Sequence, residues 1–261
     1  MSIITLTTDF GQADHYVACM KGVILQIEPR AQIVDVTHAI GPHDVVHGAF
    51  VLRQVAEHFP AGTIHVAVVD PGVGTTRRMI AARYEGHVIL APDNGLVSLV
   101  QRDFVLEELR SIENTRLFRP EVSTTFHGRD ILAPVAGNLA RGLPLDAVGP
   151  AIDQLEILNL EKATPLAGGG IEGQVLYVDR FGNLISNISA EELSVAFPAF
   201  EGLNVHVGPL RVGPLRGTYG DVAPGEIVAL IGSTGMLEIA INQGHAAEQL
   251  RAGPGTVVVV R

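Results

Sequence analysis

Short β-branched runs alternate with longer amphipathic segments over roughly the first 160 residues, and this alternation constrains the fold more than any other feature. Strands are predicted at residues 3–7, 32–36, 63–69 and 87–91. Helical spacing of apolar residues appears at 16–27, 45–59 and 130–139, and Asp14 and Asp44 stand where the first two helices should begin. Because alternating strands and helices are typical of parallel sheets, we expect an α/β domain with a mainly parallel sheet.

The pattern changes after residues 160–170, which contain Pro165 and three consecutive glycines. Proline and glycine interrupt regular structure, so this stretch is the predicted linker. Short strands are then predicted at 171–178, 203–207, 226–231, 236–241 and 256–260. Such closely spaced strands indicate a small barrel or sandwich. The expected organisation is an α/β domain over residues 1–163 and a smaller, barrel-like all-β domain over residues 171–261.

Composition narrows the range of partners. A formal net charge of −10 disfavours nucleic-acid binding, which needs clustered Lys and Arg. No apolar run approaches the ~20 residues that span a bilayer, and the N-terminus lacks the basic start of a signal peptide. The single cysteine, Cys19, lies in an apolar helical pattern and is expected to be reduced and buried. These features predict a cytoplasmic protein that binds a small molecule rather than a membrane or nucleic acid.

A glycine-rich loop follows the predicted strand at 63–69. Asp70 comes directly after this strand, and the glycines behind it allow a tight turn that returns Arg77 toward the carboxylate. His127 lies in a second predicted loop. Because ligands and catalytic side chains gather at the carboxyl ends of strands in α/β sheets, these residues and Asp9, which ends the first strand, predict one active-site pocket.

Simpler explanations stay open for several polar residues. Asp9 stands where α/β folds often bind ribose hydroxyls, but an aspartate there can equally cap the following helix. His43 and His47 are spaced like two zinc ligands, yet Asp44 is predicted to begin the helix, which leaves His43 outside it and argues against a metal site. The sequence has no Gly-x-Ser-x-Gly, no phosphate-binding Gly-Lys-Ser/Thr and no Gly-x-Gly-x-x-Gly after the first predicted strand, so serine-hydrolase, P-loop and NAD-binding classes are disfavoured.

Polar residues also gather in two turns of the second domain. Asp179, Phe181 and Asn183 follow the predicted strand at 171–178, and Ser233 lies in a Gly-Ser-Thr-Gly turn. Both a charged hairpin turn and a ligand site explain these residues, and the sequence does not separate the two.

These segments together resemble the family of S-adenosyl-L-methionine (SAM) hydrolases that form adenosine, also called SAM hydroxide adenosyltransferases, which are related to fluorinating and chlorinating enzymes. The resemblance runs essentially end to end and is carried by residues 8–11, 70–75, 91–96, 126–130, 179–183 and 232–235. Any one of these blocks is a weak signal, whereas their ordered combination is specific. The resemblance implies an α/β domain, a β-barrel domain and a homotrimer with active sites between neighbouring subunits.

The resemblance also implies a role for each matching residue. It makes Asp70, Arg77 and His127 the residues that activate water, and it implies no metal and no cofactor. The substrate contacts that it implies are Asp9 for ribose, Phe181 and Asn183 for adenine with Asn242 and Gln243 nearby, and Asp179, Ser233 and Asp14 for methionine.

Departures from the family pattern bear on the reaction. Halogenating relatives carry tyrosine in place of Asp70, and the fluorinating enzymes carry serine in place of Gly128. A carboxylate repels a halide but can orient or deprotonate water. We therefore predict hydrolysis of SAM to adenosine and L-methionine by attack of water at C5′, with formation of 5′-chloro-5′-deoxyadenosine, or binding without catalysis, as alternatives. His43 and Ile185 replace aromatic residues of relatives, which leaves the packing around methionine open.

Overall fold

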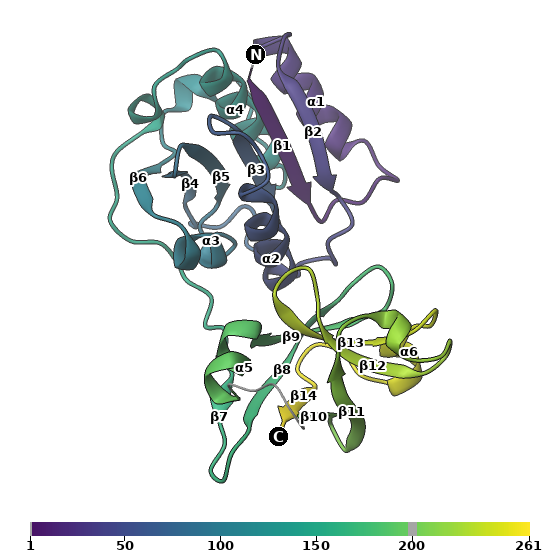
Figure 1. The fold of residues 1–261 in the computed structure, drawn as a ribbon. Helices are drawn as coiled ribbons and strands as arrows, with labels where there is room; N and C mark the ends of the chain where they lie inside the picture. Colours follow the sequence, from purple (N-terminus) through teal and green to yellow (C-terminus); the bar gives the residue numbers. More distant parts are fainter. Residues whose placement is uncertain (1, 198–202) are drawn as a thin grey trace. The chain divides into compact units, whose positions relative to one another are not determined.

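The computed structural model describes residues 2–197 and 203–261, which form two compact units. The first unit ends at Leu158 and the second begins at Asn159, beside the predicted linker. The predicted α/β architecture followed by an all-β barrel is confirmed (Figure 1).

A six-stranded sheet forms the centre of the first unit, in the order β2-β1-β3-β5-β4-β6. The strands are β1 (Ile3–Thr8), β2 (Gln32–Thr37), β3 (Ile64–Val68), β4 (Met79–Tyr84), β5 (His87–Pro92) and β6 (Leu106–Ser111). The four predicted strands are confirmed and run parallel to one another. The sequence analysis missed β4 and β6, which pair in antiparallel fashion, so one side of the sheet is mixed.

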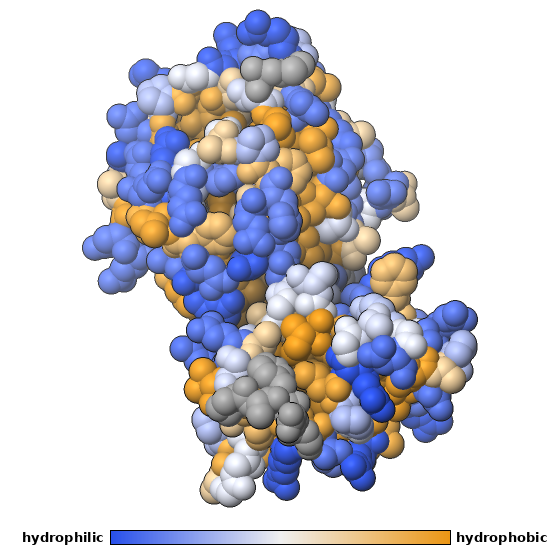
Figure 2. Space-filling model, viewed as in Figure 1, coloured by the Kyte–Doolittle hydropathy of each residue, from blue (hydrophilic) through white to orange (hydrophobic). Residues whose placement is uncertain are grey.

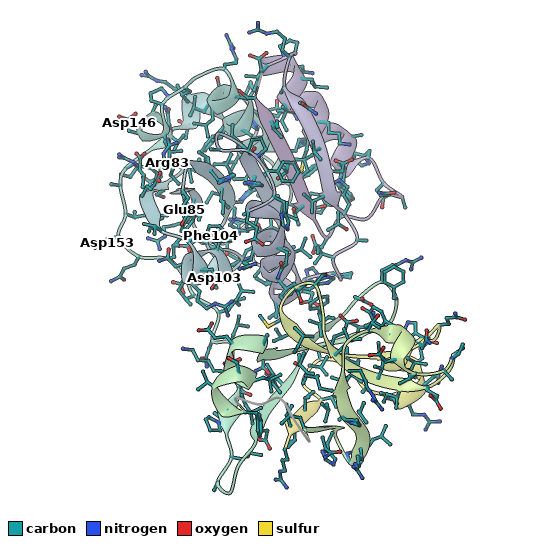
Figure 3. The ribbon with its side chains drawn as sticks, in the orientation of Figure 1. Arg83, Glu85, Asp103, Phe104, Asp146 and Asp153 are labelled. Atoms are coloured by element: carbon teal, nitrogen blue, oxygen red, sulfur yellow. The ribbon has the colours of Figure 1, made fainter. Side chains whose placement is uncertain are left out.

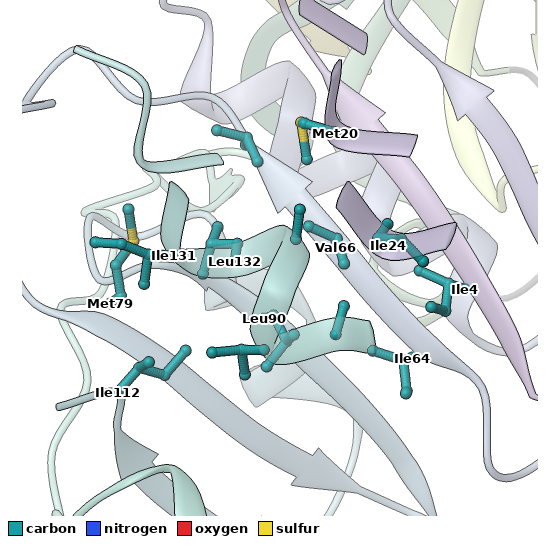
Figure 4. Packing of buried hydrophobic residues seen from close by; sticks show 14 of the residues in the cluster. Ile4, Met20, Ile24, Ile64, Val66, Met79, Leu90, Ile112, Ile131 and Leu132 are labelled. Carbon is teal, nitrogen blue, oxygen red and sulfur yellow. The ribbon is translucent and has the colours of Figure 1, made fainter. Parts of the chain in front are cut away.

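Helices pack against the sheet (Figure 1). They are α1 (Tyr16–Ile27), α2 (Val45–Ala56), α3 (Ser98–Asp103) and α4 (Ala133–Ala140), with short helical turns at Thr115–Leu117, Gly128–Leu132 and Leu145–Val148. Met20 and Ile24 of α1 share one buried cluster with strand residues such as Ile4, Val66 and Leu90 (Figure 4). This cluster lies between α1, α4 and one face of the sheet, and it fixes the strands whose ends carry the predicted site.

The helix starts test two predictions. Asp44 begins α2, and its side chain accepts a hydrogen bond from the His47 N–H at 2.9 Å, as predicted. Asp14 does not begin α1: His15 stands at that position and makes no side-chain cap. The helix predicted at 130–139 is divided, because a π-helical turn at Gly128–Leu132 precedes α4. Cys19 is a free thiol that is only partly buried against the core.

The second unit is a closed barrel, which settles the choice between barrel and sandwich. Its strands are β7 (Thr164–Pro165), β8 (Ile171–Val178), β9 (Leu184–Ser189), β10 (Asn204–Val207), β11 (Leu210–Arg216), β12 (Ile227–Ile231), β13 (Met236–Ile241) and β14 (Val257–Val260). Pairing of β14 with β8 closes the ring. Two helices, α5 (Ala190–Ala196) and α6 (Ala246–Leu250), and a turn at Tyr219–Asp221 complete it. The predicted linker contributes β7, whereas β9 and β11 were not predicted.

Charged side chains mark one side of the first unit, where β4, β6 and α3 lie. Arg83, Glu85 and Asp103 are among them (Figure 3). Arg53 of α2 donates to Asp103 at 2.8 Å and lies over the ring of Phe104. Hydrophilic residues cover much of the visible surface of both units (Figure 2). Among the described residues, no helix is both long and apolar enough to cross a membrane.

Candidate active site

Two of the predicted acidic residues lie at neighbouring strand ends. Because β1 and β3 are parallel neighbours, Asp9 after β1 and Asp70 after β3 reach the same edge of the sheet. The Asp9 N–H donates to the Val68 carbonyl at 3.4 Å, which ties the two strand ends together. The carboxyl ends of parallel strands are the usual place for a ligand site, and the topology meets that expectation.

Asp70 and Arg77 form a two-pronged ion pair. Arg77 Nε donates to Asp70 Oδ1 at 2.6 Å, and a terminal guanidinium nitrogen donates to Asp70 Oδ2. Only 6% of the Asp70 side chain and 10% of the Arg77 side chain are exposed. A bidentate pair of this kind fixes both side chains in direction as well as distance. The predicted return of Arg77 to Asp70 is therefore confirmed.

The loop between these residues depends on one glycine. Gly74 has a φ of +81°, and a Cβ atom there would lie 2.5 Å from the Thr124 carbonyl oxygen. Only glycine combines this left-handed backbone with so close an approach. The close approach seats the loop of Asp70 and Arg77 on the segment that leads to His127.

His127 joins the pair through Arg77. A terminal guanidinium nitrogen lies 3.1 Å from His127 Nδ1. Since a guanidinium has donors only, Nδ1 accepts and the proton of neutral His127 is on Nε2. Burial and the charge of Arg77 lower the pKa of His127 below its ordinary value, and Asp70 and Asp130 offset part of this change. His127 is therefore held neutral near pH 7 with its Nε2–H free of the ion pair.

Asp130 anchors the His127 loop, a role that the sequence analysis did not assign. Its carboxylate is fully buried and accepts hydrogen bonds from Arg129 at 2.6 and 2.8 Å and from the Ser123 N–H at 2.9 Å. Burial would raise the pKa of Asp130, but these hydrogen bonds and the nearby arginines outweigh it and hold the pKa below its ordinary value. Its place inside the block 126–130, which carries part of the family resemblance, is the sequence signal that could have identified it.

Asp9 and Asp14 do not join this group directly. Asp9 Oδ2 accepts a hydrogen bond from the backbone N–H of His43 at 2.9 Å, and Asp14 is exposed. His43 has a φ of +66° and lies before α2, as predicted. Within residues 2–197 and 203–261, no group of three or more His, Cys, Asp and Glu side chains is arranged to hold a metal ion.

Three of the predicted adenine and methionine contacts lie in one turn of the second unit, and the aspartate of that turn holds it together. Asp179 Oδ1 accepts from the N–H groups of Phe181 at 2.8 Å and Asn183 at 2.9 Å, and Asp179 Oδ2 accepts from Asn183 Nδ2 at 3.0 Å. Phe181 stands at the tip of the turn with 73% of its surface exposed. The turn between β8 and β9 therefore presents an aromatic face to solvent.

Gln243 and Asn242 lie in a turn that reaches the Asp179 turn. A Cβ atom at Gly182 would overlap the ring of His245, which follows Gln243 by two residues. Asn242 Nδ2 donates to the Val222 carbonyl at 2.8 Å, and Gln243 is exposed with a φ of +56°. Two predicted substrate segments are thus neighbours in the barrel.

A buried carboxyl group, Glu238, lies beside the Ser233 turn, and the sequence analysis missed it. Its side chain accepts a hydrogen bond from the Tyr219 hydroxyl at 2.5 Å and approaches Gly232 closely. Burial raises the pKa of Glu238, and the charge of Asp179 raises it further, while the Tyr219 hydrogen bond acts in the opposite direction. The Ser233 turn and the Asp179 turn therefore both lie near Glu238. Leu237 and Ile239 of β13 pack in the barrel core, so alternation places Glu238 on the other face, and no pattern in the sequence indicated its burial.

Family models match the chain in both units. The model of the SAM hydroxide adenosyltransferase N-terminal domain matches residues 4–149, and that of the C-terminal domain matches residues 173–259. The chain belongs to the SAM hydroxide adenosyltransferase family. The two matches fall on the α/β unit and on the barrel, so the family's domain division follows the fold.

Relatives within this family carry two kinds of name. A protein of Salinispora tropica named (R)-S-adenosyl-L-methionine hydrolase is 42% identical, with 97% of this chain and 95% of that protein covered. A Thermus thermophilus protein of the same name is 39% identical, with 99% of each covered. A protein named fluorinase from an Actinoplanes species is 31% identical, with 99% of this chain and 97% of that protein covered.

Solved structures show the same fold. An uncharacterized conserved protein from Thermotoga maritima aligns with a TM-score of 0.90 at 36% identity, covering 100% of this chain and 99% of that one. A conserved hypothetical protein from Thermus thermophilus aligns with a TM-score of 0.80 at 36% identity, with full coverage of both chains.

Proposed function

We propose that this member of the SAM hydroxide adenosyltransferase family hydrolyses SAM to adenosine and L-methionine. The contact among Asp70, Arg77 and His127 at the end of β3 carries the proposal. Relatives named (R)-S-adenosyl-L-methionine hydrolase support the same substrate and reaction. In this reaction water adds to C5′ as the C5′–S bond breaks. Methionine leaves as a neutral thioether, and one proton is released.

The substrate itself explains why these three residues suffice. A sulfonium is a cationic leaving group, so departure of the thioether needs no general acid, and the remaining task is to activate water. Each Asp70 oxygen keeps a lone pair beyond its bond to Arg77, so the carboxylate can accept the proton of a water molecule. Neutral His127 can hold that water through its Nε2–H, and Arg77 supplies a positive field that favours hydroxide character.

We further propose where the substrate lies and how the protein assembles. The ribose hydroxyls bind Asp9, adenine lies against Phe181 and Asn183 with Asn242 and Gln243 beside it, and methionine binds Asp179, Ser233 and Asp14. The protein is a cytoplasmic homotrimer with its sites between subunits. Light scattering on the purified chain tests the trimer, and a monomer at working concentration contradicts it.

The proposed reaction uses no metal and no cofactor, because the bond that breaks is already activated by the positive charge on sulfur. We expect adenosine formation to continue at an unchanged rate after dialysis against EDTA. Loss of activity that returns when a divalent cation is added would contradict this part of the proposal.

Chromatography of SAM incubated with the protein in chloride buffer tests the function. Adenosine is the expected product. 5′-Chloro-5′-deoxyadenosine would indicate halide transfer instead, and tight binding in calorimetry without product would indicate a sensor. We expect Asp70→Ala and His127→Ala to lose most turnover yet still bind SAM, whereas Asp103→Ala, which removes a surface partner of Arg53, keeps full turnover. Full activity in both site variants contradicts the assignment.

A further inference from the structure

The block at 91–96 carries part of the family resemblance, yet no substrate contact is assigned to it. It begins in the last two residues of β5, which lies between β3 and β4 in the sheet (Figure 1). Because β3 is parallel to β5 and β4 is antiparallel to it, the end of β3, the end of β5 and the start of β4 share one edge. The loop at 69–78, which carries Asp70 and Arg77, therefore crosses the end of β5.

Asn94 holds the first end of that loop. Its Nδ2 donates to the carbonyl oxygen of Val69 at 2.8 Å, and Val69 is the fully buried residue directly before Asp70. Its Oδ1 accepts from the Leu96 N–H at 3.2 Å, which fixes the side chain in a local turn. A side chain held from both ends in this way is a rigid support for the backbone above it.

Asp93 holds the second end. Its N–H donates to the Arg78 carbonyl at 2.9 Å, and its Oδ2 accepts from the Arg78 guanidinium at 3.0 and 2.6 Å. Its Oδ1 accepts from the Glu156 N–H at 2.8 Å, and only 2% of its side chain is exposed. Arg78 directly follows Arg77, so the buried carboxylate fixes the position from which Arg77 returns to Asp70.

We propose that Asn94 and Asp93 are positioning residues, which hold the two ends of the 69–78 loop so that Asp70 and Arg77 meet His127 in a reactive arrangement. The inference rests on the proposed hydrolysis of SAM. The proposed substrate contacts lie on other segments, so a loosened loop impairs the chemical step more than binding. A displacement of about 1 Å at reacting groups can lower the rate about 100-fold.

Asn114 provides a matched control. Its Nδ2 donates to the Ala147 carbonyl at 2.8 Å, and its Oδ1 accepts from the Arg116 N–H at 3.2 Å, which repeats the two bonds of Asn94 at the same distances. Serine at either position keeps an oxygen for the local turn but is too short to reach the distant carbonyl. Asn94→Ser and Asn114→Ser therefore each remove one hydrogen bond of the same kind. The first bond lies beneath the proposed site and the second lies away from it.

We expect Asn94→Ser to lower kcat for adenosine formation at least tenfold while KM for SAM stays within about threefold, an estimate that follows from misplaced catalytic groups. Asn114→Ser should lower the melting temperature about as much as Asn94→Ser does. It should keep kcat within about twofold, because it leaves the 69–78 loop in place. Equal kcat in Asn94→Ser and the unmodified protein overturns the inference while the proposed function stands. An unmodified protein that forms no adenosine overturns the proposed function instead.

The ring of His127 supplies a readout that needs no turnover. We expect its NMR titration, assigned by the signal missing from His127→Gln, to move toward the ordinary pKa in Asn94→Ser, because Arg77 then moves away from it. Asn114→Ser should leave the titration unchanged. If Asn94→Ser does not fold, Arg78→Lys tests the Asp93 end by both readouts. Its control is Arg102→Lys, which likewise replaces a guanidinium that donates twice to an aspartate, Asp103. Unchanged kcat and an unchanged His127 titration in Arg78→Lys contradict the inference.

Discussion

The stability of the first unit should depend on pH through one buried histidine, His65 of β3. Its ring is fully buried, with Nδ1 at 2.8 Å from the Thr5 hydroxyl and Nε2 at 3.3 Å from His87 Nδ1. Burial, and then the neighbouring His87, lower the pKa of His65 from 6.5 to about 4. The substitution that isolates this group is His65→Gln, because glutamine supplies a polar amide in place of the ring and does not titrate.

The difference between the two pKa values sets the size of the effect. An unfolded chain binds a proton at His65 near pH 6.5, whereas the folded protein resists it until about pH 4. Stability is therefore unaffected above pH 6.5 and falls as the pH drops from 6.5 toward 4. At about 1.36 kcal/mol per pKa unit, the full loss is about 3 kcal/mol, and about 2 kcal/mol of it is present at pH 5.

Urea unfolding at pH 7.5 and pH 5, followed by circular dichroism, measures this loss. We expect the unmodified protein to lose about 2 kcal/mol more than His65→Gln between the two pH values. His58→Gln is the control, because the His58 side chain is 74% exposed and should leave the pH dependence unchanged. Equal losses in the unmodified protein and His65→Gln would refute the reasoning, since another group would then be responsible for the acid sensitivity.

Three further outcomes follow from the site. Gly74→Ala should lower the free energy of unfolding by about 2 kcal/mol and reduce adenosine formation, measured by urea titration and chromatography, because alanine meets both the left-handed backbone and the Thr124 carbonyl. Since burial and the charge of Arg77 lower the pKa of His127, the acid fall in kcat/KM should have its midpoint below the ordinary histidine pKa of about 6.5; a midpoint above that value contradicts this. If the carboxylate charge binds the substrate, Asp179→Asn should raise KM for SAM at least tenfold, with a modest loss of melting temperature because the bond from Asn183 Nδ2 is disturbed. A lower melting temperature at unchanged KM would leave Asp179 as a turn residue only.

The four parallel strands could be predicted because they are rich in β-branched and other apolar residues, and three of them, β1, β3 and β5, are almost wholly buried. Three of the missed strands, β4, β6 and β11, are poor in β-branched residues. Residues 79–84 contain two alanines and an arginine, residues 106–111 contain two glutamates, and residues 210–216 contain a glycine and a proline. Each becomes a strand because a neighbour pairs with it, as β5 pairs with β4. Tertiary pairing of this kind leaves little trace in local periodicity.

The proposed site likewise contains one contact that could be predicted from local sequence and one that could not. Asp70 and Arg77 could be predicted to meet because only six residues of a glycine-rich loop lie between them. The ion pair follows from that local geometry. His127 lies 50 residues beyond Arg77, and its contact depends on Gly74 seating one loop on the other. Sequence spacing carries no information on such a contact. Loop positions predicted a shared pocket, the family resemblance grouped His127 with Asp70 and Arg77, and the structure gives the physical cause of the contact.

Charge compensation gives the site its final constraint. Three arginines lie in or beside the catalytic loops, and each is paired with a low-exposure aspartate: Arg77 with Asp70, Arg78 with Asp93 and Arg129 with Asp130. At an effective dielectric constant near 20, an unpaired guanidinium about 7 Å from a sulfonium would oppose binding by about 2 kcal/mol. The pairing reduces that repulsion, while the guanidinium of Arg77 still faces His127. The proposed activation of water beside a cationic substrate needs such local pairing, because overall net charge alone does not cancel a field at this range.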